Sequence, residues 1–207
     1  MLGWDNVTGF ASDKLTLTIH DHAGRTHQVT VDFAKQQIAS SIETGAVPIT
    51  VDLARHVAGL RQKCIAMEEC WAVLDSVDED MCVLVPEHPR RYDLWRRISL
   101  GELVTGHLEV SADRPVPRIT VYGPRARAEA LNARARGIRS RWDLGRSVRE
   151  NLEGILQVEL PQKGVDKGEA NIQCGICFAF RNGDECADQT CSNDHCAQPF
   201  HRQCLVK

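Results

Sequence analysis

Two short segments near the start of the chain, residues 14–21 and 29–33, alternate hydrophobic with polar positions. Their apolar residues are Leu15, Leu17, Ile19, Val29, Val31 and Phe33. A period of two is typical of strands with one buried face. Because the turn residues 22–25 separate the two segments, we expect a β-hairpin here.

A longer segment repeats apolar residues at steps of three and four, which is the period of one helix face. These residues are Leu53, Val57, Leu60, Cys64, Met67, Trp71 and Leu74. We expect a helix with Thr50 as its N-cap that ends near Val77, where the acidic run 78–80 interrupts the pattern. The spacing places Met67 and Trp71 in the core and argues against a cofactor site.

The second part of the chain repeats the order of strands followed by a helix. We expect strands at 81–85, 98–100, 108–110 and 119–122, with a turn at Pro115 and Pro117. Helices should follow at 125–136, ending at Gly137, and around 148–156. This order predicts an α+β fold with two related lobes of antiparallel strands plus helices.

Charge is distributed unevenly along the chain. Hydrophobic residues make up 43% of the sequence, but we find no apolar run near the roughly 18 residues of a membrane span, so no membrane partner is expected. The net charge is −3, whereas residues 90–149 hold fourteen arginines against six acidic residues. This basic segment could contact nucleic acid or an acidic partner, or its arginines could lie on solvated helix faces.

Six of the nine cysteines lie in the last 34 residues of the chain. Five of these cysteines and one histidine form three ligand pairs, Cys174-x2-Cys177, Cys191-x4-Cys196 and His201-x2-Cys204. Such spacing is typical of zinc sites. The clustering and the lack of a secretion signal favour reduced thiols over disulfides.

The ligand order corresponds to the first three-quarters of an eight-ligand module that binds two Zn²⁺ ions. Since alternate pairs share an ion in such a module, we expect the first and third pairs to form one complete site. The middle pair then supplies half of a second site. Cys186 is interpreted as a non-ligand, and His195 as a solvated neighbour of Cys196.

Two apolar residues lie inside or beside the first ligand pair. Ile176 stands between Cys174 and Cys177, where a side chain is pushed outward and held rigidly, and Phe178 follows directly. Rigid apolar side chains on a small scaffold are good docking anchors. The alternative for these two side chains is that they pack in the interior of the module. The alternative for the module is a purely structural one, in which zinc cross-links a segment too small to fold alone.

Several histidines cluster near the predicted hairpin. His20, Asp21, His22 and His27 could suggest a further metal site. We interpret them instead as polar residues of a solvated turn.

Several segments of the chain carry a resemblance to a known family. They are CGICFAF at 174–180 and residues 188–189 and 198–201, with further segments upstream at 70–79, 83–89, 96–101, 142–143 and 151–152. Through these segments the chain resembles the Fanconi anaemia complementation group L family of RING-type ubiquitin ligases. These motifs are distributed over most of the chain.

The resemblance implies three regions. Residues 1–160 would form a central double-RWD domain that binds substrate, with lobes of roughly 1–90 and 91–160. Residues 161–171 would be a linker, and 172–207 a partial RING module. Ile176 and Phe178 would contact a ubiquitin-conjugating enzyme, and no side chain of the chain would act as a covalent catalyst.

The implied activity is monoubiquitination of the Fanconi anaemia DNA-clamp proteins during repair of DNA interstrand crosslinks. Core-complex subunits are further expected partners, and the expected location is the nucleus, with the cytoplasm as a second possibility. The family's N-terminal domain and last zinc ligands are not in the sequence, so we expect a fragment. The alternatives are a zinc-stapled interaction scaffold and a PHD-like reader without ligase activity.

Overall fold

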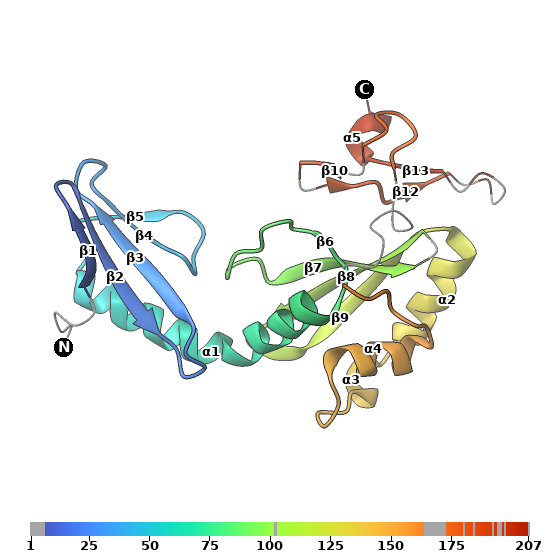
Figure 1. The fold of residues 1–207 in the computed structure, drawn as a ribbon, viewed down its shortest axis with the longest axis horizontal. Helices are drawn as coiled ribbons and strands as arrows, with labels where there is room; N and C mark the ends of the chain where they lie inside the picture. The colour runs from blue at the N-terminus through green and yellow to red at the C-terminus, as the bar shows by residue number, and fades with distance from the viewer. Residues whose placement is uncertain are drawn as a thin grey trace. The chain divides into compact units, whose positions relative to one another are not determined.

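The computed structural model describes residues 7–101, 103–163, 173–179, 181–183, 185–191, 193, 196 and 198–206. The chain divides into two compact units (Figure 1). The first comprises Met1–Trp71 with Arg90–Asp93, and the second comprises Ala72–Pro89 with Leu94–Lys207. Residues 164–171 of the expected linker lie outside the described residues.

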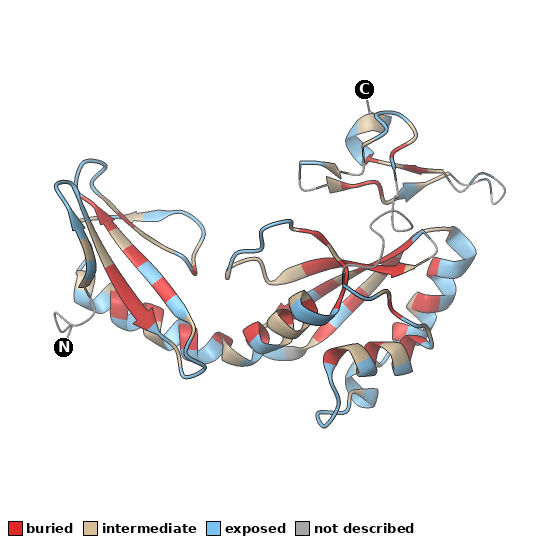
Figure 2. Cartoon of the chain, viewed as in Figure 1, coloured by how far each residue is buried: buried red, intermediate tan, exposed pale blue. Residues whose placement is uncertain are grey.

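The first unit contains a five-stranded antiparallel sheet whose strands pair in sequence order. The strands are β1 (Val7–Ala11), β2 (Lys14–His20), β3 (Thr26–Asp32), β4 (Gln37–Ser40) and β5 (Ala46–Pro48). The predicted hairpin is confirmed as β2 and β3, and Figure 2 shows buried and exposed residues alternating along β3. Phe33 was wrongly placed on the buried face, because β3 ends before it and its side chain is 41% exposed.

Helix α1 (Leu53–Asp80) carries the predicted apolar stripe, most of which is buried. Thr50 is not its N-cap. The carboxylate of Asp52 instead accepts hydrogen bonds from the backbone N–H groups of Ala54 and Arg55, at 2.9 and 3.3 Å. The helix also continues past Val77, because the Asp78 carboxylate binds the Arg96 guanidinium through two hydrogen bonds of 2.6 and 2.8 Å.

The second unit contains a four-stranded antiparallel sheet, also in sequence order. Its strands are β6 (Val83–Val85), β7 (Trp95–Gly101), β8 (Val104–Ser111) and β9 (Arg114–Tyr122). All four predicted strands are confirmed; β6 is shorter than the expected 81–85, and the other three are longer than expected. Pro115 and Pro117 lie within β9 and not in a turn, which is tolerated because β9 is an edge strand.

Helices α2 (Arg125–Ala135), α3 (Ile138–Arg141) and α4 (Val148–Leu156) follow the second sheet. Gly137 separates α2 from α3 with a φ of 70°, a backbone conformation that favours glycine. A capping box between Ser147 and Glu150 starts α4. Within the described part of the chain, none of the helices is long and apolar enough to cross a bilayer.

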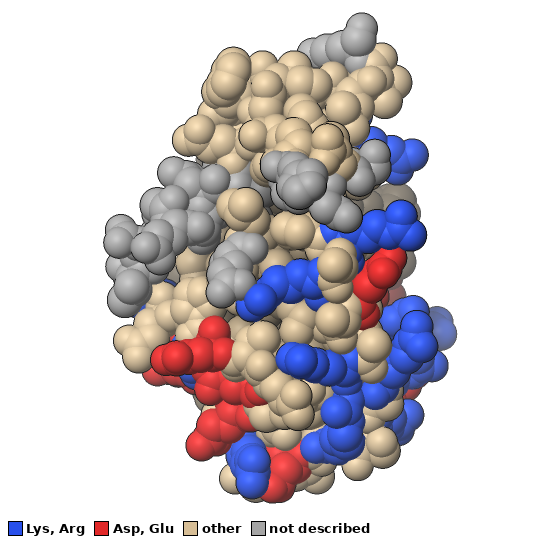
Figure 3. All heavy atoms as spheres, turned by 90° about the vertical axis from the view of Figure 1, so that its right-hand side faces the viewer, with Lys and Arg blue, Asp and Glu red and all other residues tan. Residues whose placement is uncertain are grey.

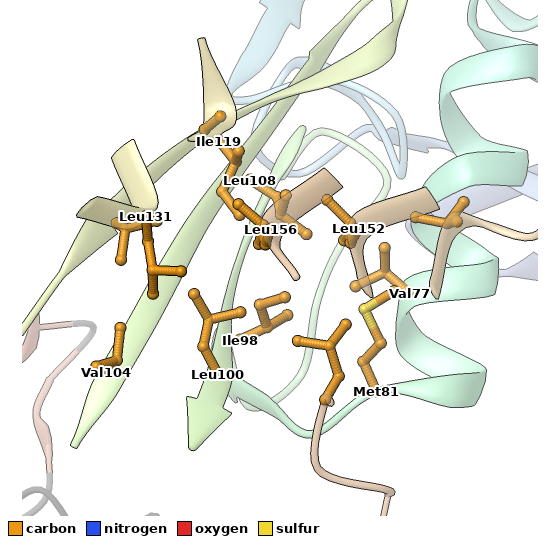
Figure 4. Close-up of a cluster of buried hydrophobic side chains, with 14 of the residues drawn as sticks. Val77, Met81, Ile98, Leu100, Val104, Leu108, Ile119, Leu131, Leu152 and Leu156 are labelled. Atoms are coloured by element: carbon orange, nitrogen blue, oxygen red, sulfur yellow. The ribbon is translucent and has the colours of Figure 1, made fainter. Parts of the chain in front are cut away.

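The core of the second unit lies between its sheet and its helices (Figure 4). Ile98 and Leu108 from the sheet meet Leu152 and Leu156 from α4, together with Val77 near the end of α1. Each of these five side chains is at most 1% exposed. Burial of this apolar surface is the main stabilising contribution to the unit.

The C-terminal residues of the second unit form a small module of short elements. These are β10 (Arg181–Asn182), β11 (Glu185–Cys186), β12 (Gln189–Thr190), β13 (Pro199–Phe200) and α5 (Arg202–Leu205). β10 pairs with β11 and β12 pairs with β13, both antiparallel. Two-residue strands are too short to be stable by themselves, so this module needs another source of order.

Replacing a core leucine of α4 should destabilise the chain far more than replacing an exposed one. Leu152→Ala should lower the free energy of unfolding by about 2–5 kcal/mol, because it opens a cavity among fully buried neighbours. Leu144→Ala is the matched control, since Leu144 is 88% exposed, and should change stability by no more than about 0.5 kcal/mol. Urea denaturation measures both, and equal effects would contradict the assigned core.

Candidate metal centre

Four ligand-type side chains converge in the C-terminal module. The Sγ atoms of Cys174, Cys177 and Cys204 and a ring nitrogen of His201 all lie within 4.8 Å of one another. His201 Nδ1 is 3.3 Å from Cys177 Sγ and 3.8 Å from Cys204 Sγ. These are the first and third ligand pairs of the sequence, so the four-residue group expected from the spacing is brought together.

Local structure explains how distant segments reach one site. The β12–β13 hairpin brings residue 201 back toward Cys174, and the Gly175 N–H donates to the Pro199 carbonyl at 2.9 Å. Gly175 is required there, because an added Cβ would lie 2.7 Å from Cγ of Gln198. His201 is the N-cap residue of α5, and Cys204 lies within that helix.

The environment of Cys174 favours its thiolate form. Burial alone would raise the pKa of this thiol, but hydrogen bonds from the backbone N–H groups of Cys177, His201 and Ile176 lower the pKa to about 6. Burial and the neighbouring thiols raise the pKa of Cys204 to about 11. A bound cation would relieve this crowding of sulfur atoms, since metal ligands must be deprotonated.

The remaining cysteines of the module lie outside this group. Cys191 is partly buried and Cys196 is exposed, and neither joins a cluster of three or more ligand-type residues among those the structure describes. Cys186 is 6% exposed, and burial raises its pKa to about 11. His195 lies outside the described residues, so its interpretation stays a prediction.

Ile176 and Phe178 are both exposed beside the cluster. Their side chains are 48% and 74% exposed. Phe178 has a φ of 56°, and its N–H donates to the Cys174 carbonyl at 2.9 Å. The segment 174–178 therefore presents two apolar side chains outward, on a backbone held by this hydrogen bond.

The module is attached to the second unit's sheet by a buried ion pair that sequence reasoning missed. Arg97 on β7 is 7% exposed, and its Nη2 donates to the Asp188 carboxylate at 2.5 Å. The guanidinium also lies over the Tyr122 ring at 4.1 Å from its centre. The arginine pair Arg96-Arg97 directly before the predicted strand at 98–100 was the only local signal, and it does not identify the partner.

Further contacts surround this ion pair. Cys186 packs in an apolar cluster with Cys82, Leu84 and Val85 of the second unit. The exposed Glu87 carboxylate accepts from Arg181 at 2.7 Å. Cys186 therefore contributes to the interface between module and sheet, which gives its burial a structural explanation.

The histidine cluster near the hairpin is not a solvated turn throughout, which corrects the interpretation above. His20 and His22 are exposed, but His27 is 1% exposed and the Asp21 side chain is fully buried. His27 Nε2 lies 3.3 Å from the Asp21 carboxylate, and its ring lies 4.8 Å from that of Trp71. The register of β3 places His27 on the inner face of the sheet, as it does Val29.

Fold and site together define a class of protein: an α+β chain whose second unit carries a small Cys₃His module that could hold a metal ion. Two family models match it, FANCL UBC-like domain 3 over residues 69–163 and FANCL C-terminal domain over residues 170–207. E3 ubiquitin-protein ligase FANCL of Mus musculus is 31% identical over 220 residues. Over these residues the chain is similar to the FANCL family.

The match to the mouse protein covers 100% of this chain and 59% of that relative's length. A solved structure described as the crystal structure of FANCL is also similar, with a TM-score of 0.61 and 18% identity. The structural match covers 95% of this chain and 62% of the chain in that crystal structure. This likeness confirms the α+β fold expected from the sequence.

Removing one ligand of the cluster should abolish metal binding at this site. We expect Cys177→Ser to lose about one zinc ion per chain, because a structural site needs four ligands. Cys196→Ser is the matched control and should retain that ion, since Cys196 lies outside the group. Inductively coupled plasma mass spectrometry of purified protein measures both, and retention of zinc in Cys177→Ser would refute the assigned ligand set.

The buried His27 should make stability depend on pH. Burial lowers the pKa of His27, although its hydrogen bond with Asp21 opposes the shift. Below about pH 6.5 the unfolded chain binds a proton that the folded chain resists, so stability should decrease as the pH falls from there.

His27→Gln should reduce this slope. Urea denaturation at several pH values between about 5 and 7 tests the expectation against the unaltered chain. His20→Gln is the control, because His20 is exposed, and it should leave the slope unchanged. Identical slopes in His27→Gln and the unaltered chain would show that His27 titrates normally.

Proposed function

We propose that the chain is the substrate-binding and conjugating-enzyme-recruiting part of a RING-type ubiquitin ligase. The observation that carries this proposal is the pair Ile176 and Phe178, exposed on the backbone that also holds Cys174 and Cys177. The mouse relative is an E3 ubiquitin-protein ligase, which supports the same activity for this chain.

Zinc is the metal that the donor set fits. Three sulfurs and one imidazole nitrogen are typical zinc ligands, with Zn–S near 2.3 Å and Zn–N near 2.0–2.1 Å. A tetrahedral array with these bond lengths separates nitrogen from sulfur donors by about 3.6 Å, close to the 3.3 and 3.8 Å distances from His201 Nδ1. Bound there, zinc would supply structural cross-linking of the short strands.

The module's own residues would provide docking and orientation. Ile176 and Phe178 would insert into an apolar surface of a ubiquitin-conjugating enzyme, where fixed apolar anchors contribute most of the binding energy. The chain needs no nucleophile of its own for transfer, because the conjugating enzyme already carries ubiquitin as a thioester. Bringing that thioester near a substrate lysine accelerates the reaction by proximity and orientation.

Substrate, pathway and location follow from the family resemblance and are proposed with it. The α+β units would bind the Fanconi anaemia DNA-clamp proteins, and the product would be a single ubiquitin on a lysine of those proteins. Other partners would be subunits of the Fanconi anaemia core complex. The reaction would take place in the nucleus during repair of DNA interstrand crosslinks.

Truncating one docking residue should weaken conjugating-enzyme binding without releasing the metal. Ile176→Ala should raise the dissociation constant about tenfold or more, the effect of losing an anchor worth about 1.4 kcal/mol or more. Isothermal titration calorimetry against a ubiquitin-conjugating enzyme measures the affinity, and metal analysis of the same sample shows that the cluster remains intact.

Leu144→Ala serves as the control, since it also removes an exposed apolar side chain from the second unit. It should bind the conjugating enzyme normally. If Ile176→Ala bound as well as the unaltered chain, the docking role would be wrong. A scaffold or a histone reader would show no affinity for the conjugating enzyme in either form.

A further inference from the structure

Lysine is missing from the middle of this sequence. No lysine occurs between Lys63 and Lys163, although that stretch holds fourteen arginines. The rest of the chain contains six lysines and five arginines. Positive charge is therefore kept in the lysine-free stretch, whereas Lys163, Lys167 and Lys207 follow it in the second unit.

Some of these arginines make ion pairs or hydrogen bonds that a lysine would make poorly. Arg96 and Arg97 are buried and use the guanidinium for ion pairs with carboxylates. Arg149 donates to backbone carbonyls of Asp80, Leu160 and Pro161. Several donors on a planar group suit these positions better than a single ammonium.

Most of the exposed arginines have no such requirement. Arg118, Arg136 and Arg139 are exposed and make no ion pair among the described residues. Three more are exposed and pair with nearby surface carboxylates that lysine would also satisfy: Arg114, Arg125 and Arg146. Figure 3 shows Lys and Arg side chains gathered over part of the face that it draws.

The conjugating-enzyme docking residues belong to the same compact unit as these arginines. The Arg97–Asp188 and Arg181–Glu87 ion pairs and a hydrogen bond from Thr190 to the Gly123 carbonyl hold the module to the sheet. A thioester recruited to this module would therefore be present at high effective concentration around the second unit. Any exposed amine on that unit would compete with the substrate.

We propose that residues 72–162, which form the sheet and helices of the second unit, exclude lysine so that recruited ubiquitin is not transferred to this part of the ligase. The inference rests on the proposed ligase function and adds a determinant of acceptor specificity to it. Arginine at the exposed positions keeps the charge and removes the nucleophile, because a guanidinium stays protonated at physiological pH.

The excluded reaction is ordinary aminolysis of a thioester. The neutral Nζ of a lysine attacks the carbonyl carbon of the ubiquitin C-terminus, which is bonded to the conjugating enzyme's cysteine. An isopeptide C–N bond forms as the C–S bond breaks, and the sulfur leaves as a thiolate. The proton lost by the amine passes to a base in solution or to that thiolate.

Lys163 marks the C-terminal limit of the lysine-free stretch. It is the one lysine of the second unit among the described residues, and its Nζ donates to the Asp78 carbonyl at 2.5 Å. The lysines of the first unit, Lys14, Lys35 and Lys63, are all exposed. Exposed amines are thus present in the first unit, which supplies a matched control, and the exposed Lys163 of the second unit lies just outside its lysine-free stretch.

The test introduces single amines into the zinc-loaded chain. Arg136→Lys and Arg139→Lys place an amine on the second unit, and Arg55→Lys places one on the first; all three positions are exposed. Each variant is incubated with activating enzyme, a ubiquitin-conjugating enzyme, ubiquitin and ATP, and ubiquitin remnants are mapped by peptide mass spectrometry. Discharge of the thioester onto free lysine is measured in parallel.

Ubiquitin should appear at positions 136 and 139 about tenfold faster than at position 55, because the module is fixed to the second unit. Discharge onto free lysine should be equal in all variants. Normal discharge with no faster modification at 136 and 139 than at 55 would overturn this inference alone. Absence of stimulated discharge in every variant would overturn the proposed ligase function and this inference with it.

Discussion

The ion pair between Arg97 and Asp188 joins the metal-binding module to the sheet of the second unit. Arg97 is buried on β7 and also stacks on Tyr122, so its charge depends on the Asp188 carboxylate for compensation. Loss of one partner would leave the other charge buried, which is costly. The pair therefore specifies where the module sits, and with it where Ile176 and Phe178 face solvent.

A metal ion would provide the module's internal order. Its strands are two residues long, and its buried apolar group around Cys174 and Ala187 is small. Few apolar contacts cannot offset the conformational entropy of such a segment. Ligands from residues 174–177 and 201–204 would close a loop of about 30 residues, so metal binding and folding of the module should be coupled.

Much of the architecture could be predicted from the sequence, because periodic apolar patterns and ligand spacing are local signals. The stripe along α1, the β2–β3 hairpin, the later strands and the ligand group of Cys174, Cys177, His201 and Cys204 were all expected. Strands β1, β4 and β5 were not, since they are short and their burial patterns do not alternate cleanly.

Three of the errors share one cause, because a partner distant in the sequence determined the environment of a polar residue. Asp78 stays helical because Arg96, eighteen positions later, binds its carboxylate. His27 is buried because the sheet register turns it inward, against Trp71. Arg97 could not be recognised as an attachment point because its partner lies 91 residues away. No local pattern carries that information.

The central claim is that the docking surface moves as one body with the second unit. Backbone ¹⁵N NMR relaxation of the zinc-loaded chain tests it directly, by comparing the amides of residues 174–179 with those of β7 and β8. The account predicts one rotational correlation time for both groups, and a shorter one for the module in Arg97→Ala. Faster, independent tumbling of residues 174–179 in the unaltered chain would contradict it.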